Sequence, residues 1–120
     1  MQDVAVIGAG KIGATAAGML ASAGYRVTLA DRSPAALDRI ERQQNVRCVQ
    51  TNVENSPSLL ELLNDQAAVV NCAPFHLTLR IAEAARAART HYLDLTEDVA
   101  STRRVKELAA DAGTAFIPQC

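Results

Sequence analysis

Three glycines near the start of the chain have the spacing of a phosphate-binding turn. Gly8, Gly10 and Gly13 form the pattern G-x-G-x-x-G inside the run VAVIGAGKIG at 4–13. Glycine at the first position permits a sharp turn, and glycine at the second leaves room for a phosphate group beside the backbone. The third lets a helix pack closely on a sheet, and the N–H groups that begin this helix attract anions. The spacing therefore predicts a pyrophosphate site.

An acidic residue follows at the distance that a dinucleotide-binding motif requires. Residues 11–23 are small or apolar and end at Gly24, and residues 25–30 have the composition of a strand. Asp31 comes next, about 18 residues after Gly13, and the motif places its ribose-binding acid about 20 residues on. This order predicts a βαβ unit that binds a dinucleotide, whereas the glycines alone would also fit an ordinary strand-to-helix turn.

The residues after the second strand bear on the choice between NAD and NADP. A carboxylate at Asp31 would accept hydrogen bonds from the ribose 2′- and 3′-hydroxyls and repel a 2′-phosphate. Two unit charges 4 Å apart repel by on the order of 4 kcal/mol at an effective dielectric constant of about 20. The guanidinium of Arg32 could instead receive the phosphate of NADP or stack on adenine. We therefore predict NAD as the cofactor, with NADP as the alternative.

The rest of the chain alternates between helical and strand patterns. Ser33-Pro34 and Ser56-Pro57 are helix-start signals. Helices are expected at 35–43, 59–63, 75–89 and 98–112, and strands at 46–53, 67–73, 91–96 and 115–119. Alternation of this kind predicts the α/β class, as one domain over residues 1–120. Its expected architecture is a doubly wound parallel sheet of the Rossmann type, with six strands in the order 3-2-1-4-5-6.

Composition and charge exclude several classes of function. Twelve basic and thirteen acidic residues leave a net charge of −1, which argues against nucleic acid or an anionic membrane as a partner. The three cysteines form no C-x-x-C pair, and the sequence opens without a signal-peptide pattern, so a cytoplasmic location is expected. Cys48 and Cys72 fall in predicted strands, where we expect small buried hydrophobes rather than metal ligands or nucleophiles.

The predicted topology selects candidate site residues without further information. Ligands of such a sheet lie across the carboxyl ends of the strands. The residues at these ends are Asp31 and Arg32, Asn52 and Val53, Ala73, Pro74 and Phe75, and Thr96 and Glu97. His76 is a candidate base near the nicotinamide, although the start of a helix explains it better, and His91 is interpreted as structural. Asp94 is expected to satisfy a hydrogen bond at the sheet end rather than to transfer a proton. None of these residues is assigned as the catalytic residue, which is therefore unknown.

The chain resembles the saccharopine dehydrogenase family, in its N-terminal NAD(P)-binding domain. The resemblance covers essentially all 120 residues. It rests on the glycine run, on LADR at 29–32, on VVNCAP at 69–74, on HYLDLTED at 91–98 and on AFIPQC at 115–120. The glycine motif is common to many families, whereas VVNCAP followed by a helix and HYLDLT is much more particular.

The resemblance implies an NAD(P)-dependent oxidoreductase. The reaction would be hydride transfer between a secondary amine and its imine, on a small amino-acid-like substrate. Carried over by position, the pyrophosphate would be surrounded by Gly8, Gly10, Lys11, Ile12 and Gly13, and the adenosine ribose by Asp31 and Arg32. Adenine would be flanked by Asn52 and Val53, and the nicotinamide ribose supported by Ala73 and Pro74. Asn52 stands where such proteins often have Asp.

Two further expectations concern the extent of the protein and a rival function. Family members continue past the sixth strand into a substrate domain, so this chain is expected to be the cofactor half of a longer enzyme. Alone it would be inactive and would associate as a homodimer through the edge near Phe116. The rival is a nucleotide-sensing regulatory module of the potassium-uptake type, with a similar size, glycine turn and acid. The segments NCAP at 71–74 and HYLDLT at 91–96 favour the dehydrogenase.

Overall fold

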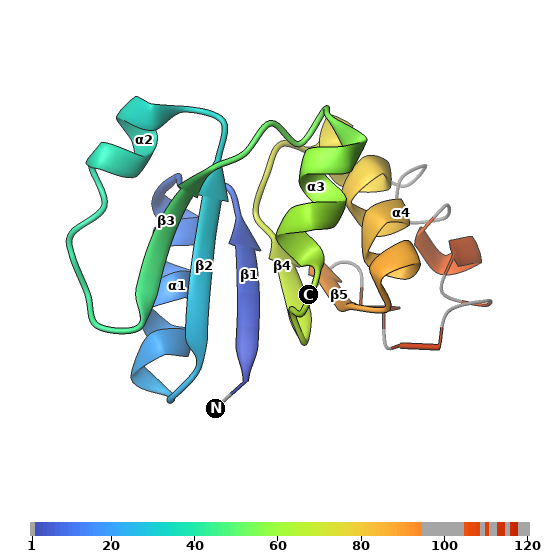
Figure 1. The fold of residues 1–120 in the computed structure, drawn as a ribbon, viewed down its shortest axis with the longest axis horizontal. Helices are drawn as coiled ribbons and strands as arrows, with labels where there is room; N and C mark the ends of the chain where they lie inside the picture. The colour runs from blue at the N-terminus through green and yellow to red at the C-terminus, as the bar shows by residue number, and fades with distance from the viewer. Residues whose placement is uncertain (1, 95–104, 109, 111–112, 115, 118–120) are drawn as a thin grey trace.

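Parallel strands form one sheet at the centre of the molecule (Figure 1). The computed structural model describes residues 2–94, 105–108, 110, 113–114 and 116–117. The strands are β1 (Asp3–Ile7), β2 (Arg26–Asp31), β3 (Val46–Gln50), β4 (Ala68–Asn71), β5 (His91–Asp94) and β6 (Phe116–Ile117). Their order is β3-β2-β1-β4-β5-β6, and every neighbouring pair is parallel. The predicted fold class and strand order are confirmed.

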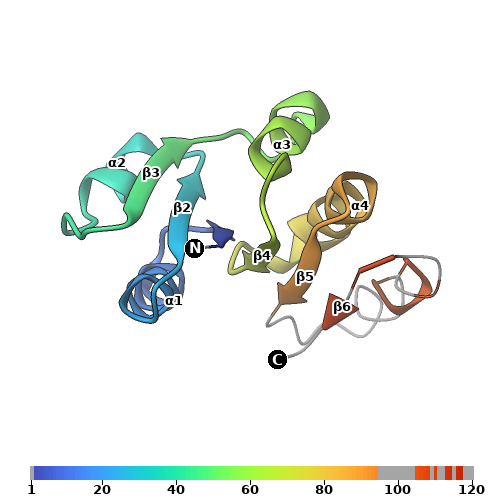
Figure 2. The same cartoon turned by 60° about the horizontal axis from the view of Figure 1, so that its bottom comes forward.

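Helices cover both faces of this sheet. They are α1 (Lys11–Ser22), α2 (Pro34–Asp38), α3 (Ser56–Leu63) and α4 (Thr78–Ala88), and a 3₁₀ turn (Phe75–Leu77) precedes α4. α1 lies on one side of the sheet, and α3 and α4 lie side by side on the other (Figure 2). β1 contributes to the core on both faces of the sheet, because successive side chains of a strand point to opposite faces. Val6 packs in the cluster that contains α1, while Ala5 and Ile7 pack in the cluster of α3 and α4.

Both serine–proline signals lie at the starts of helices, but the cap of the second helix differs by one position from the prediction. The Ser33 hydroxyl accepts a hydrogen bond from the backbone N–H of Ala36, as predicted for a cap. α3 is capped one residue earlier than predicted, since the side chain of Asn55 accepts from the N–H of Ser58. Ser56 is therefore the first helical residue.

Several elements are shorter than the sequence pattern predicts. The strand expected at 67–73 is observed as β4 over Ala68–Asn71, and the helix expected at 75–89 begins with a 3₁₀ turn and continues as α4 to Ala88. The helix expected at 35–43 ends at Asp38, because the stretch 41–45 is polar and exposed and has nothing to bury against the sheet. The strand expected at 46–53 ends at Gln50. The side chain of Asn52 accepts a hydrogen bond from the N–H of Glu54 and turns the chain away from the sheet.

The edge position of β3 also changes the environment of a cysteine. Cys48 is exposed, which corrects the expectation of a buried residue. A strand at the edge of the sheet has less cover than a central one, and none of the β3 residues is fully buried. Cys72 lies just after β4 and is half-buried, so the expectation of a buried residue within a strand is met only in part.

Part of the C-terminal prediction lies outside the described residues. Residues 105–108 and 110 are helical, in agreement with the helix expected at 98–112, and β6 falls within the strand expected at 115–119. The rest of both ranges, with Thr96 and Glu97, is not among the described residues. Within the described part, no helix has the length and apolar character needed to cross a bilayer.

Candidate dinucleotide-binding site

Tight packing requires glycine at two positions of the turn between β1 and α1. Gly8 has φ 107°, a conformation that favours glycine, and a Cβ there would lie 2.6 Å from the carbonyl oxygen of Cys72. A Cβ on Gly13 would lie 1.7 Å from the carbonyl oxygen of Gly8. No side chain fits at either position. The first and third glycines of the motif therefore hold β1, α1 and the end of β4 together.

Gly10 differs from the other two glycines of the motif, because no nearby protein atom would exclude a side chain at this position. A Cβ on Gly10 would have no atom within 4 Å, and the residue has an ordinary φ of −73°. α1 begins just after it without a side-chain cap, so the first N–H groups of the helix keep the hydrogen-bonding capacity that a phosphate uses. The space beside Gly10 and these donors fit the pyrophosphate of a dinucleotide. Lys11 and Ile12 next to it are both exposed.

Asp31 connects the glycine turn to the end of β2. Its Oδ2 accepts a hydrogen bond of 2.7 Å from the N–H of Ala9, and its Oδ1 accepts one of 2.8 Å from the N–H of Ser33. A carboxylate offers about four acceptor sites, so about two remain for ribose hydroxyls. The residue is half-buried. Asp31 thus fixes the loop while keeping acceptor capacity at the carboxyl edge of the sheet.

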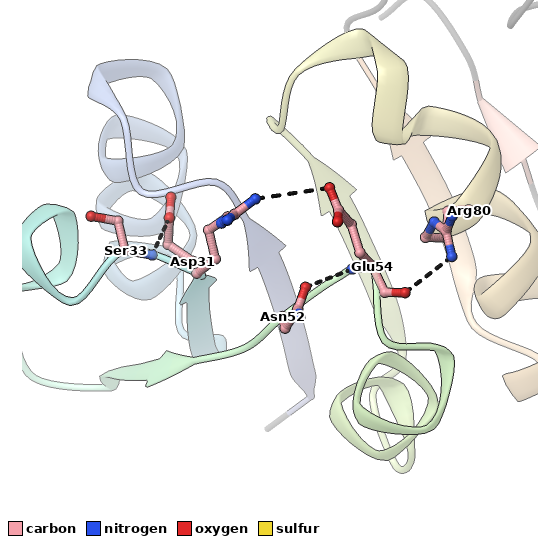
Figure 3. Close-up of polar contacts among 6 residues, drawn as sticks. Asp31, Ser33, Asn52, Glu54 and Arg80 are labelled. Carbon is pink, nitrogen blue, oxygen red and sulfur yellow. Dashed lines mark hydrogen bonds and ion pairs between the residues drawn. The ribbon is translucent and has the colours of Figure 1, made fainter.

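Beyond Asp31, contacts between polar and charged side chains connect the loops that follow β2 and β3 (Figure 3). The guanidinium of Arg32 lies 3.8 Å from the carboxylate of Glu54, and both side chains are more than half exposed. The backbone of Glu54 is fixed at both ends: its N–H donates to Asn52 Oδ1 and its carbonyl accepts from Arg80. This loop carries Asn52 and Val53, the predicted adenine contacts. Val53 is only 4% exposed and packs in the core.

A buried network lies at the carboxyl ends of β4 and β5. Asn71 and Asp94 are register partners across the two strands. The side-chain amide of Asn71 donates to the Tyr92 hydroxyl over 3.1 Å, and this hydroxyl donates to Asp94. The carbonyl oxygen of the Asn71 side chain accepts from the N–H of Ala73, so the network fixes the loop that was predicted to support the nicotinamide ribose. Asp94 accepts a side-chain hydrogen bond at the sheet end, much as predicted.

The remaining candidates lie around this loop. Pro74 and His76 are exposed, Ala73 is half-buried, and His76 belongs to the 3₁₀ turn before α4. Cys72 lies against the glycine turn, 3.5 Å from the position that a Cβ on Gly13 would take. Burial raises the pKa of the Cys72 thiol, so this thiol loses its proton only at a higher pH than an exposed cysteine does.

The structure brings most of the predicted residues to one edge of the sheet. The glycine turn, Asp31, Arg32 and Asn52 follow the carboxyl ends of β1, β2 and β3, and Ala73 follows β4. Sequence reasoning missed the part played by Glu54, although the pattern Asn52-x-Glu54 after a strand is typical of a side-chain-supported turn. It also missed the pairing of Asn71 with Tyr92, which depends on the register of two strands.

The family model described as the saccharopine dehydrogenase NADP binding domain matches residues 4–117. This chain belongs to that family. Its cofactors are therefore the nicotinamide dinucleotides, and the resemblance to saccharopine dehydrogenases is confirmed. No curated protein matches the sequence.

Solved structures with the same fold include dehydrogenases and epimerases. The apo saccharopine dehydrogenase (L-Glu forming) from Saccharomyces cerevisiae superposes with a TM-score of 0.88 at 18% identity, over 99% of this chain and 27% of that protein. UDP-glucose 4-epimerase from Brucella ovis, in complex with NAD, gives 0.79 at 15% identity over 98% of this chain and 51% of that one. A Rossmann-fold NAD(P)-binding family protein from Shigella flexneri gives 0.75 at 19% identity, over 98% and 66%. The chain thus spans about a quarter of the length of the yeast saccharopine dehydrogenase.

Proposed function

We propose that residues 1–120 are the cofactor-binding domain of an oxidoreductase that acts on a carbon–nitrogen bond of an amino-acid-derived substrate. The observation that carries the proposal is the space beside Gly10, where a Cβ would have no protein atom within 4 Å. A residue whose side chain would meet no protein atom has no structural need to be glycine. The family match, which names saccharopine dehydrogenase, supports the type of reaction.

Each half of the proposed site has a separate role. The turn at Gly10 and the first N–H groups of α1 would hold the pyrophosphate, and Asp31 would accept from the adenosine ribose. Ala73, whose N–H is fixed by Asn71, would support the nicotinamide ribose. When bound, the dinucleotide supplies or accepts the hydride. The protein's part is to orient the cofactor against the substrate.

NAD is the proposed preference of this site over NADP. The ribose-facing group is a carboxylate, Asp31, and a second carboxylate, Glu54, lies on the next loop. The carboxylate of Asp31 disfavours a 2′-phosphate, which carries close to two negative charges at neutral pH. A cytoplasmic location, recognition of the substrate by a further domain, and a homodimer complete the proposal. The domain alone is then expected to bind the cofactor without turnover.

Equilibrium titration of the 120-residue chain tests this proposal. NADH and NADPH are added and followed by their fluorescence, with ADP measured by calorimetry as the ligand that lacks the nicotinamide half. We expect saturable binding of NADH that is tighter than binding of NADPH or ADP. If neither dinucleotide binds at millimolar concentration, the proposed function is wrong. If NADPH binds more tightly than NADH, the proposed preference is wrong while dinucleotide binding stands.

A further inference from the structure

The carboxylate of Glu54 lies close enough to Arg32 to form an ion pair with its guanidinium. The two residues lie on different loops, one after the carboxyl end of β2 and the other between β3 and α3, and Figure 3 shows Glu54 on the second loop. Their nearest charged atoms are 3.8 Å apart. Arg32 directly follows Asp31, the proposed ribose ligand, so a cationic residue is the sequence neighbour of the proposed ribose site.

The backbone of Glu54 is held in place independently of the ion pair. Asn52 accepts from its N–H over 3.0 Å, and Arg80 from α4 donates to its carbonyl oxygen over 3.1 Å. The next residue, Asn55, caps α3. The loop is therefore fixed by hydrogen bonds that do not involve the Glu54 carboxylate. A change confined to that carboxylate should leave the loop where it is.

The charges in this region favour a dinucleotide without a 2′-phosphate. Asp31 and Glu54 are acidic, and the guanidinium of Arg32, which directly follows Asp31, lies 3.8 Å from the Glu54 carboxylate. A 2′-phosphate would need the Arg32 guanidinium, which binds phosphate through two parallel hydrogen bonds. Glu54 already attracts the same group. Binding of NADP would therefore have to displace the ion pair, whereas binding of NAD would not.

We propose that Glu54 is a specificity-determining residue, which disfavours NADP by competing with its 2′-phosphate for Arg32. The inference rests on the proposed dinucleotide site and adds to it a residue from the loop after β3. It would also account for the proposed preference for NAD in a chain with arginine directly after the proposed ribose-binding acid. In this arrangement, cofactor choice depends on a pair of side chains rather than on Asp31 alone.

The test compares the dissociation constants of NADPH and NADH for single and double variants of the 120-residue chain. Glu54→Gln keeps the shape and the backbone contacts of residue 54 and removes only its charge. Glu41→Gln is the matched control, since Glu41 is exposed on the connection between α2 and β3 and the charge change is the same. We expect Glu54→Gln to shift the ratio toward NADPH by about two- to fivefold, the size expected for an exposed ion pair. Glu41→Gln should shift it less than about 1.5-fold.

A second background separates competition from direct repulsion. If Glu54 acts through Arg32, then Glu54→Gln should no longer change the ratio once Arg32→Gln is present. A shift that persists in that background would show that the carboxylate repels the phosphate directly, and the proposed competition would be wrong. The competition would also be wrong if Glu54→Gln gives the same ratio as Glu41→Gln. Failure of the unmodified chain to bind either dinucleotide is a different result, and it would refute the proposed function instead.

Discussion

Asp31 at the end of β2 and Ala9 in the glycine turn are joined by a hydrogen bond of 2.7 Å, in which the backbone N–H of Ala9 donates to the carboxylate. The second oxygen accepts from the N–H of Ser33. One side chain therefore fixes the phosphate-binding turn, fixes the start of the following loop, and retains acceptors for the ribose. Replacing Asp31 therefore changes the order of the turn and the affinity for the cofactor together.

Asp31→Ala should weaken binding of NADH by about ten- to a hundredfold. Hydrogen bonds to a charged group contribute roughly 1.5–3 kcal/mol, and here the loss includes the order of the turn. Binding of NADPH should weaken less, because repulsion of the 2′-phosphate is lost at the same time. Calorimetry with both ligands measures the two effects. Asp31→Asn is the control that keeps one acceptor oxygen, and it should lie between the parent and Asp31→Ala; equal NADH affinity in all three would contradict the role of Asp31.

Gly10→Val should abolish dinucleotide binding and leave the fold intact. The open space at Gly10 accepts a side chain sterically, and this side chain would stand where the pyrophosphate is expected. Loss of the glycine at the start of α1 should cost no more than about 1 kcal/mol of the free energy of unfolding. Circular dichroism during urea unfolding measures stability, and NADH fluorescence measures binding. Unchanged NADH affinity would remove Gly10 from the site.

Gly13→Ala is the contrasting variant on the same helix. A Cβ there collides with the carbonyl oxygen of Gly8, so the strand and helix would have to separate. Overpacking of this kind costs about 1–3 kcal/mol or more of the free energy of unfolding. The same urea experiment should show the loss clearly. A chain with Gly13→Ala that is as stable as the parent would contradict the close packing of α1 on β1.

Tyr92→Phe should destabilise the fold by about 1–3 kcal/mol. The Tyr92 hydroxyl donates to Asp94 and accepts from Asn71, and both of these partners are almost fully buried. Removing the hydroxyl leaves buried polar groups without that partner, which is the costly case for a hydrogen bond. Tyr25→Phe is the matched control, because the Tyr25 side chain is partly exposed. Equal urea midpoints for the two variants would show that the network contributes no stability.

The described thiols should differ in their reaction with iodoacetamide. Cys48 is exposed, whereas Cys72 is half-buried and burial raises its pKa. Since the thiolate is the reactive form, a raised pKa leaves less of it at a given pH, and labelling of Cys72 should accelerate only as the pH rises further. Peptide mapping by mass spectrometry separates the sites. In urea the two should react alike, and equally fast labelling in the folded chain would contradict the burial of Cys72.

The strand order was predictable because it follows from local signals that agree with each other. The glycine turn, Asp31 and the two serine–proline pairs mark the places where the chain changes direction, and parallel crossovers leave few topologies. The boundaries of α2 and β3 were less predictable. They depend on burial: residues 41–45 are polar and exposed, and β3 is an edge strand that leaves Cys48 exposed.

The positions of the candidate site residues could be predicted from the sequence, whereas most of their hydrogen bonds and ion pairs could not. Residues at strand ends can be placed once the topology is known, so Asp31 and Asn52 were found. The hydrogen bonds of Asp31 to Ala9 and Ser33, and the approach of Glu54 to Arg32, depend on loop conformation. No periodic pattern in the sequence encodes a loop conformation, because side chains in turns compete with the backbone for hydrogen bonds.

The pairing of β1 with β4 has a consequence for the order of folding. Val4 pairs with Ala68, so several helices and two strands separate these partners in the chain. Closing so long a loop is entropically costly, and contacts between sequence neighbours such as β1 and β2 form more easily. The carbonyl of Cys72, just after β4, lies against Gly8. The phosphate-binding turn is therefore fully packed only once β4 has joined the sheet. During refolding, affinity for a dinucleotide should therefore emerge later than the first secondary structure, as a slow kinetic phase of its own.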